Sequence, residues 1–229
     1  MENVKIVKTK EGDNYFERNL KFYKNLRNDD FRIVDLLTTT QIKPKSILEI
    51  GCANGIQLNQ YQEILNTKVN YGIDLSSKAI NAGKKKFKKL RLLKLSSLEI
   101  DKIKTNFDLI ICGFFLYLLD REEIFNQFNL ICKKLNQNGY LIIQDYNPLF
   151  KHTNTSRHNR NIKSFKMNYD NFLIESGLFK MIYKVEKAHP LLAWITKQRK
   201  NKINKYKSTE EAISLYKKIN FSDYYPENL

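Results

Sequence analysis

Short apolar runs of strand type alternate with stretches of helical periodicity through the first two thirds of the chain. The runs are rich in Ile, Leu and Val and cover residues 46–51, 69–74, 90–95, 107–113 and 140–145. Helical periodicity separates them at residues 56–65, 77–87 and 121–135. Because strands that alternate with helices of this length pair in parallel through right-handed crossovers, we expect an α/β fold with a doubly wound, mostly parallel sheet.

The two ends of the chain add further elements to this pattern. Two helices are expected before the first strand, at residues 15–28 and 31–40, and the second ends at the Pro44 breaker. After the fifth strand, residues 146–166 are polar and without a period, which predicts a long loop. A short helix closed by Gly177 and two more strands, at residues 179–186 and 212–219, are expected to follow. No linker interrupts the chain, so residues 1–229 are expected to form a single domain.

Composition excludes several broad classes. The chain is 42% hydrophobic and 28% charged, which is too apolar for a disordered protein and too charged for a membrane protein. No segment has the apolar length of a signal peptide or a spanning helix. The three cysteines are far apart, so neither a disulfide framework nor a metal site is expected, and a cytoplasmic location fits best. A net charge of +16 suggests an anionic partner or nucleic acid, although a coding bias toward Lys and Asn explains it equally well.

The motif with the clearest chemistry is SILEIGCANGIQL, at residues 46–58. It places Glu49 near the end of a buried strand and puts Gly51 and Gly55 in the turn into a helix, where a ligand meets bare backbone. The motif has neither the GxGxxG spacing nor the P-loop lysine that bind phosphates. The Glu49 carboxylate repels phosphate and attracts an ammonium group, so a ligand without phosphates is expected. The alternative is a tight strand-to-helix connection with no ligand.

A second acidic residue follows at the expected distance. The run YGIDLS ends the next strand at Asp74, the position from which an acidic side chain holds a ribose diol in doubly wound folds. The alternative is that Asp74 caps the helix that starts near Ser76. The order of strand, glycine turn, helix, strand and acid favours the ribose interpretation.

With these motifs in place, the chain resembles the class I S-adenosylmethionine-dependent methyltransferases over residues 15–186. ILEIGCANG is similar to their first motif, with Ala53 where a middle glycine is common. FDLIICGFFLYLLD and LNQNGYLIIQD are similar to their fourth and fifth strands, and Ser96 and Ser97 stand where an Asp often meets the adenine. The resemblance implies a seven-stranded, Rossmann-like sheet and S-adenosylmethionine as the cofactor. The implied cofactor residues are Tyr15, Arg18, Glu49, Gly51, Cys52, Ala53, Gly55, Asp74, Leu75, Ser96, Ser97, Cys112 and Gly113.

Two further stretches resemble a narrower group of small bacterial methyltransferases. They are GDNYFERN, at residues 12–19, and residues 158–169. The resemblance implies that residues 14–42 form a helical lid over the cofactor, in which Arg18 pairs with the methionine carboxylate. The alternative for Tyr15 and Phe16 is ordinary helix packing.

Candidates for catalysis and acceptor binding lie after the carboxyl ends of the strands, where ligands bind in open α/β sheets. Residues 146–167 are the expected substrate loop. His158 is the first choice for a general base because imidazole titrates near neutral pH, with Asp145 after the fifth strand as the second catalytic candidate. The expected acceptor-binding residues are Tyr117, Tyr146, His152 and Lys166. The alternatives are an exposed loop histidine, a packed Tyr117 and a solvated Lys166.

The sequence therefore predicts a methyltransferase that acts on a small molecule such as a sugar or nucleotide-sugar, with no metal and no membrane contact. An anionic acceptor is expected because Lys166 and the positive charge offer it a partner. Two alternatives stay open: an RNA acceptor, which the net charge favours, and a non-catalytic module that binds S-adenosylmethionine, which the Ser96 departure allows.

Overall fold

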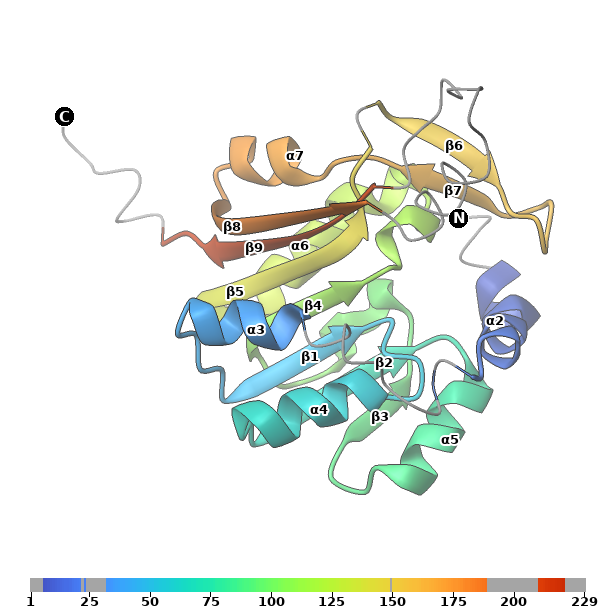
Figure 1. Cartoon of the computed structure of the whole chain (residues 1–229), viewed down its shortest axis with the longest axis horizontal. Coiled ribbons are helices and arrows are strands. Elements are labelled where there is room, and N and C mark those ends of the chain that lie inside the picture. The colour runs from blue at the N-terminus through green and yellow to red at the C-terminus, as the bar shows by residue number, and fades with distance from the viewer. Residues whose placement is uncertain (1–5, 22, 24–31, 149, 189–209, 221–229) are drawn as a thin grey trace.

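The computed structural model of the chain describes residues 6–21, 23, 32–148, 150–188 and 210–220. Figure 1 shows a twisted sheet with helices on both of its faces. The sheet has seven strands in the order β3-β2-β1-β4-β5-β9-β8. They are β1 (Ser46–Ile50), β2 (Val69–Asp74), β3 (Arg91–Lys94), β4 (Phe107–Gly113), β5 (Leu135–Tyr146), β8 (Phe179–Ala188) and β9 (Glu210–Lys218). Strands β1 to β5 pair in parallel and β9 is antiparallel to both of its neighbours, so the expected doubly wound, mostly parallel sheet is confirmed.

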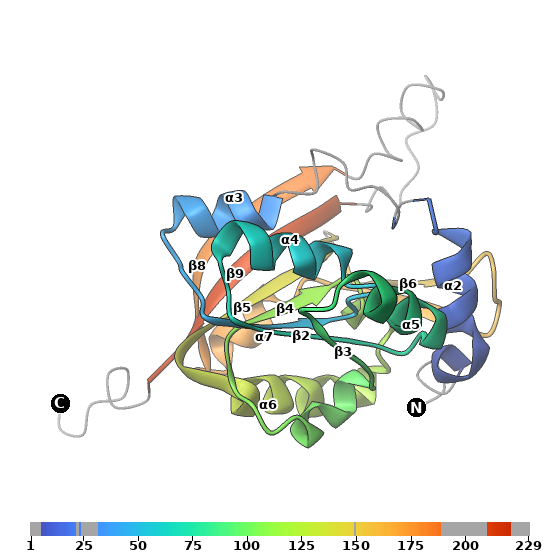
Figure 2. The same ribbon diagram turned by 90° about the horizontal axis from the view of Figure 1, so that it is seen from below.

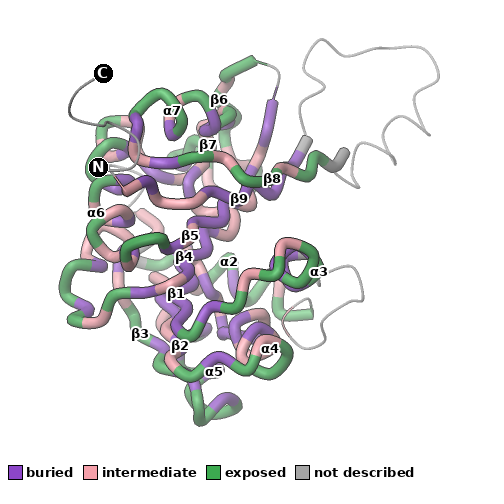
Figure 3. Tube along the Cα trace, turned by 90° about the vertical axis from the view of Figure 1, so that its left-hand side faces the viewer, coloured by how far each residue is buried: buried purple, intermediate pink, exposed green. Residues whose placement is uncertain are grey.

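Helices cover both faces because the central strands are apolar on both sides. The helices are α3 (Arg32–Thr39), α4 (Ile56–Leu65), α5 (Ser77–Lys86), α6 (Ile124–Lys134) and α7 (Asp170–Glu175). In β1, Ile47 joins the core cluster shared with α3, α4 and α5, whereas Leu48 joins the cluster shared with α6 and α7. Figure 2 shows α3 and α4 on one side of the sheet and α6 on the other, and the tube in Figure 3 is buried along β1, β4 and β5. This two-sided burial is the physical reason why the strands read as continuous apolar runs.

The N-terminal helix is shorter than expected. A π-helical turn, Val7–Glu11, leads into α2 (Gly12–Arg18), which ends where Asn19 donates its side-chain amide to the Tyr15 carbonyl at 2.9 Å. The prediction of a helix over residues 15–28 is therefore wrong in the described part, because a local side-chain bond competes with the next helical turn. Residues 22 and 24–31 lie outside the described residues.

The segment expected as an irregular loop after β5 contains a β-hairpin. Its strands are β6 (His152–Thr155) and β7 (Lys163–Lys166), which pair antiparallel. The turn is held locally, because the Ser156 hydroxyl accepts from the backbone N–H groups of His158 and Asn159, each at 3.3 Å. The strands are short and mostly polar: β6 is largely exposed, whereas β7 is partly buried and ends at the buried Lys166, so no apolar alternation marks them in the sequence. Residues 189–209 lie outside the described part of the chain.

In the described ranges, no helix combines the length with the apolar character that crossing a bilayer requires.

Candidate active site

A cavity of about 620 Å³ lies beyond the carboxyl ends of β1, β2 and β4. Three groups of residues line it. The motif end consists of the lining residues between Glu49 and Ser97, and the hairpin end of those between Gly113 and Glu211. The third group, called the lid below, consists of those between Val7 and Tyr23. The lid expected at residues 14–42 is wrong for α3, which packs with α4 in the core and does not line the cavity. Figure 1 shows α2 and the β6–β7 hairpin beyond this same edge of the sheet. The volume is typical of small-molecule sites.

The cavity brings most of the expected site residues together. Those that line it are Tyr15, Arg18, Glu49, Gly51, Cys52, Ala53, Asp74, Leu75, Ser96, Ser97, Gly113, Tyr117 and His158. Those that do not are Gly55, Cys112, Asp145, Tyr146, His152 and Lys166. Most of the expected cofactor residues thus gather at the motif end and the lid, with Gly113 at the hairpin end. The expected acceptor residues divide between the lining and the layer behind it.

Glu49 is the most unusual group of the motif end. Its side chain is only 3% exposed, and its Oε2 atom has no hydrogen-bond partner within the described residues. Burial, and secondarily the nearby Asp74 carboxylate, raise the pKa of Glu49 to about 8. A buried carboxylate oxygen without a donor fits an ammonium group, which supplies both the hydrogen bond and the opposite charge. The residue therefore fits the amino group of S-adenosylmethionine.

Asp74 joins the first two strand–turn units of the motif end. Its Oδ2 accepts from the Ala53 backbone N–H at 2.9 Å, and its Oδ1 accepts from the Ser76 N–H at 2.8 Å. Burial raises the pKa of Asp74, and these backbone bonds oppose that rise. The helix cap itself is Ser76, whose hydroxyl accepts from Ala79, so Asp74 is not the cap of α5. A carboxylate that accepts two backbone bonds still has lone pairs for the hydroxyls of a ribose.

The positions of the glycines in and near the first motif exclude a side chain for different reasons. Gly51 has φ +78°, and a Cβ there would lie 3.2 Å from the Gly113 carbonyl oxygen. Gly55, also left-handed with φ +76°, packs against Leu92, where a Cβ would lie 2.9 Å from a methyl carbon. Gly55 thus serves the contact between α4 and β3 rather than the cavity. A Cβ at Gly113 would meet no protein atom within 4 Å, so the bare backbone there leaves space that only a ligand uses.

Ser96 starts the short 3-10 helix after β3, Ser97–Lys102. Its hydroxyl accepts from the Leu98 N–H at 3.3 Å, and Glu99 accepts in return from the Ser96 N–H. This capping box occupies the acceptor side of the Ser96 hydroxyl. Its proton remains available to the cavity, so the residue fits an acceptor nitrogen such as those of adenine.

The lid is fastened to the motif end by side chains of α2. Asp13 accepts from the Ser76 hydroxyl at 2.7 Å and from the Lys78 N–H at 2.9 Å. Glu17 pairs with Lys78 at 2.5 Å. Arg18 lines the cavity and pairs with the buried carboxylate of Glu11 on the preceding turn. These bonds place the lid beside the start of α5.

The hairpin end contains the imidazole of His158. This residue is exposed in the turn between β6 and β7 and lines the cavity together with Ser156 and Ser164. Its position therefore gives the His158 side chain access to the cavity.

Asp145, the second catalytic candidate, lies behind the lining. It accepts from the N–H groups of Tyr146 at 2.7 Å and Tyr117 at 3.3 Å. Burial raises the pKa of Asp145 to about 7, against the effect of these bonds and of Arg121. The expectation of direct contact with substrate is therefore not supported, and the residue instead holds the segment that carries Tyr117.

Three expected acceptor residues also lie outside the lining. The Lys166 ammonium lies 3.8 Å from the centre of the Tyr146 ring, and burial lowers the pKa of Lys166. Tyr146 in turn packs edge-on against Tyr117, with ring centroids 5.1 Å apart. The ring of His152 lies near the Phe150 carbonyl, at 2.9 Å, where β6 begins. Lys166 thus supports the wall of the cavity and does not offer its charge to a ligand within it.

Of the two cysteines expected beside the cofactor, only one lines the cavity. Cys52 lines the motif end, whereas Cys112 is fully buried in the core below it. Burial raises the pKa of both thiols well above the ordinary value. Neither is a thiolate at neutral pH, so neither is a nucleophile.

Several lining residues carry no sequence signal. The most important is Glu211, 6% exposed, which the pairing of β9 with β5 places opposite Tyr146. Gln144 and the lid residues Glu11 and Tyr23 also line the cavity. No motif marks them. Strand order brings Gln144 and Glu211 to the cavity, whereas the packing of the N-terminal segment brings Glu11 and Tyr23 there.

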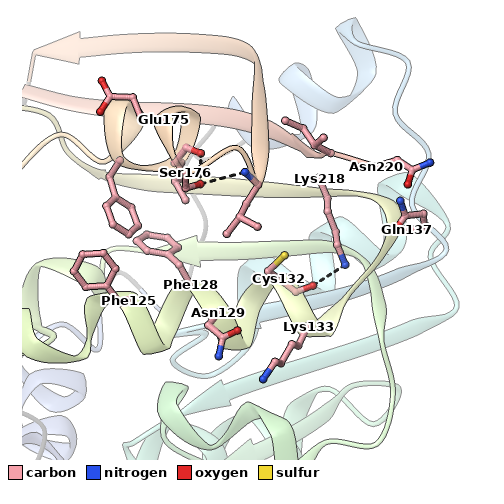
Figure 4. A pocket seen from close by; sticks show the side chains of 14 residues that line it. Phe125, Phe128, Asn129, Cys132, Lys133, Gln137, Glu175, Ser176, Lys218 and Asn220 are labelled. Atoms are coloured by element: carbon pink, nitrogen blue, oxygen red, sulfur yellow. Dashed lines mark hydrogen bonds between the residues drawn. The ribbon is translucent and has the colours of Figure 1, made fainter. Parts of the chain in front are cut away.

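A second hollow, also of about 620 Å³, lies between α6, α7 and the end of β9 (Figure 4). Its walls are mostly apolar, and Phe125 is 72% exposed there. Phe125 packs on Phe172 of α7, with ring centroids 5.0 Å apart. Because this hollow contains none of the motif residues, the first cavity is the candidate active site.

Comparison with known proteins agrees with this architecture. Residues 43–208 match the methyltransferase domain family. An uncharacterized protein of Rickettsia prowazekii (strain Madrid E) is 33% identical over 118 residues, which are 49% of this chain and 47% of that protein. The match thus spans about half the length of this curated relative.

Solved structures share the fold. Magnesium protoporphyrin IX methyltransferase from Synechocystis PCC 6803, solved with S-adenosylmethionine, has a TM-score of 0.67 at 13% identity, over 96% of this chain and 98% of that one. N-methyltransferase NodS from Bradyrhizobium japonicum WM9, solved with S-adenosylhomocysteine, has a TM-score of 0.63 at 15% identity, over 91% and 98%. The family match covers most of the chain, so this protein belongs to the methyltransferase domain family and has the class I S-adenosylmethionine-dependent methyltransferase fold.

Proposed function

We propose that this methyltransferase transfers a methyl group from S-adenosylmethionine to a small-molecule acceptor. The observation that carries the proposal is the single cavity in which Glu49 and Asp74 at one end share a space with His158 at the other. When bound, the cofactor supplies an electrophilic methyl group on a sulfonium, which needs alignment more than covalent catalysis.

The motif end and the lid would hold the cofactor. Glu49 would receive its ammonium and Asp74 its ribose hydroxyls, while Ser96 and Ser97 would face the adenine. Arg18 would bind the methionine carboxylate. Its guanidinium has several N–H donors, so it can donate to this carboxylate and to Glu11 at the same time. The glycine backbone at Gly113 leaves the approach open.

The hairpin end would hold the acceptor. His158 would accept the acceptor's proton, and Tyr117, with Tyr146 and Asp145 packed behind it, would fix the floor of the pocket. Within the described residues no lysine lines the cavity. The acceptor that we propose is a small molecule such as a sugar or nucleotide-sugar.

RNA is the second candidate because the chain carries a net charge of +16. The described part of that charge includes the exposed lysines 84–86 at the end of α5, and none of these lines the cavity. Filter binding to bulk RNA across a salt series tests this candidate. Phosphate contacts produce a steep salt dependence, and a flat response removes it.

Two measurements test the main proposal. Calorimetry should detect S-adenosylmethionine binding to the wild type and a much weaker affinity in Asp74→Ala. Exposed Glu122→Gln serves as the control and should bind as the wild type does. Labelled S-adenosylmethionine is then incubated with protein and fractionated cell extract, and label should enter small molecules. Label in RNA supports the second candidate, and no transfer to any fraction supports a non-catalytic binding module.

A further inference from the structure

The lid meets the motif end at the short turn that connects β2 with α5. The lid belongs to the N-terminal segment, between Val7 and Tyr23, whereas Asp74 lies at the start of this turn. Figures 1 and 2 show α2 next to α5. A ligand at the motif end would therefore lie between the turn and the lid, and lids of this kind control the entry and release of ligands.

The contact between the lid and the turn is made at Gly12 and Asp13. A Cβ at Gly12 would lie 3.4 Å from the Ser76 nitrogen, so α2 begins directly on the backbone of the turn. The Oδ1 atom of Asp13 accepts from the Ser76 hydroxyl at 2.7 Å and from the Lys78 N–H at 2.9 Å. The carboxylate thus lies at the N-terminus of α5, where backbone N–H groups and the helix dipole favour a negative charge. We call this contact of Asp13 with Ser76 and Lys78 the latch.

Ser76 connects the latch to the proposed ribose site. Its hydroxyl donates to Asp13 and accepts from the Ala79 N–H, and its own N–H donates to Oδ1 of Asp74 at 2.8 Å. Asp13 itself does not line the cavity. A substitution of Asp13 therefore alters the fastening of the lid without removing an atom that a bound cofactor would touch.

A second contact joins the same two helices and is weaker. Glu17 pairs with Lys78 at 2.5 Å, but both side chains are 53% exposed. An exposed ion pair contributes little, because water and salt screen its charges. Burial raises the pKa of Asp13, but the hydrogen bonds from Ser76 and Lys78 lower it by more, so its carboxylate is charged at neutral pH. Of these two contacts, the latch is the main fastening of the lid.

We propose that Asp13 latches the lid over the motif end, so that S-adenosylmethionine enters and S-adenosylhomocysteine leaves when the latch opens. Asp13 is then a positioning residue that sets the rate of cofactor exchange. The inference rests on the proposed function for the place of the cofactor beneath the lid. Because the latch consists of protein groups alone, it has the same strength with and without a ligand. Its loss should therefore speed association and dissociation by the same factor and leave the affinity unchanged.

The test measures the exchange of S-adenosylhomocysteine, with surface plasmon resonance on the immobilised full chain. In Asp13→Asn both rate constants should rise about tenfold, as expected when a charged hydrogen-bonded contact is weakened, with a dissociation constant within about twofold of the wild type. Asp13→Ala lacks the acceptor oxygens altogether and should raise both rate constants further. Glu17→Gln is the matched control, because it changes a carboxylate of the same helix, and should exchange at close to the wild-type rate.

A measurement without ligand separates the latch from the proposed function. Hydrogen exchange followed by mass spectrometry should be faster in residues 6–21 of Asp13→Asn than of the wild type, with the exchange of β1 unchanged as a check on the fold. The inference is overturned if hydrogen exchange in the lid is unchanged, if neither rate constant changes, or if only the dissociation rate rises, because a loss of affinity is what a purely structural role predicts. Failure of S-adenosylhomocysteine to bind the wild type counts against the proposed function, and hydrogen exchange then still decides whether Asp13 fastens the lid.

Discussion

The motif end and the hairpin end of the cavity are assembled in different ways. At the motif end, each lining group comes from a strand and the turn that follows it, within residues 49–57, 73–79 and 95–97. At the hairpin end, the lining comes from β4, β5, the hairpin and β9, across residues 113–211. The first end is a product of local chain geometry, and the second depends on which strands become neighbours.

The difference has a physical consequence for stability and function. The turns of the motif end are tied by backbone bonds to Asp74 and rest on the two cores of the sheet. The hairpin makes its own turn bonds, and Arg121 links it to the body by contacting Phe165 and Tyr169. Elements joined by few contacts open more readily than core strands. The motif end is therefore suited to a constant ligand, and the hairpin end to a variable one.

The largest effect should come from His158 at the hairpin end. His158→Gln removes a proton acceptor from an exposed position, so methyl transfer should fall about 100-fold or more while S-adenosylmethionine binds as in the wild type. The rate of label incorporation and calorimetry check the two halves of this prediction. If His158→Gln lowered cofactor affinity and the rate of methyl transfer by the same factor, the two ends of the cavity would not act independently.

Glu49 offers the sharpest test of the motif end. Glu49→Gln should weaken cofactor binding by about 100-fold, because the charged hydrogen bond to the ammonium is lost. Calorimetry at pH 8 measures this. Exposed Glu122→Gln is the control and should bind normally. A binding constant unchanged in Glu49→Gln would contradict the assignment.

The same residue makes stability depend on pH. The raised pKa values of Glu49, about 8, and Asp145, about 7, mean that the folded chain holds protons that the unfolded chain releases near pH 4. Ligand-free stability should therefore fall as pH rises from about 5 to 8, by a few kcal/mol in all. Denaturant unfolding across this range should show the fall, and Glu49→Gln should flatten it and be more stable than the wild type at pH 8. A wild-type stability that rises with pH would refute the account.

Gly113 and Gly51 differ in what a Cβ atom would contact. At Gly113 it would enter the cavity, and at Gly51 it would meet the protein backbone. Gly113→Ala should leave the melting temperature unchanged and weaken cofactor binding by about tenfold, because its Cβ meets only the cavity. Gly51→Ala should lower stability by about 1 to 2 kcal/mol as well, since its left-handed φ and the nearby Gly113 carbonyl both oppose a Cβ. Thermal melts of the two variants measure stability, and calorimetry measures cofactor affinity. A lowered melting temperature in Gly113→Ala would contradict the prediction that its Cβ meets only the cavity.

The smallest effect concerns Ala53, which has φ +49° in the turn of the motif. Ala53→Gly relieves the strain of a left-handed alanine but adds freedom to the unfolded chain, so we expect a stability gain of at most about 1 kcal/mol. Denaturant midpoints measure it, with cofactor affinity unchanged. A loss of stability would show that the turn tolerates the alanine without strain.

Much of the fold could be predicted because its signals are local. The bounds expected for β2, β4 and α4 agree with the structure, since buried strands and amphipathic helices have distinct periods. The expected helix over residues 15–28 was too long because a side-chain bond from Asn19 ends α2 early. The hairpin was missed because its short, mostly polar strands have no apolar alternation. Lys166 was placed in the site because nothing in the sequence reveals the ring beneath its ammonium.

By itself, the sequence determined the alternation of strands and helices, the glycine turn and the two carboxylates of the motif end. These depend on neighbours within a few residues, where backbone geometry and burial act directly. Only the tertiary structure decided that Glu211 lines the cavity and that Asp145 lies behind it. The reason is physical: strand order brings together groups that are far apart in the chain.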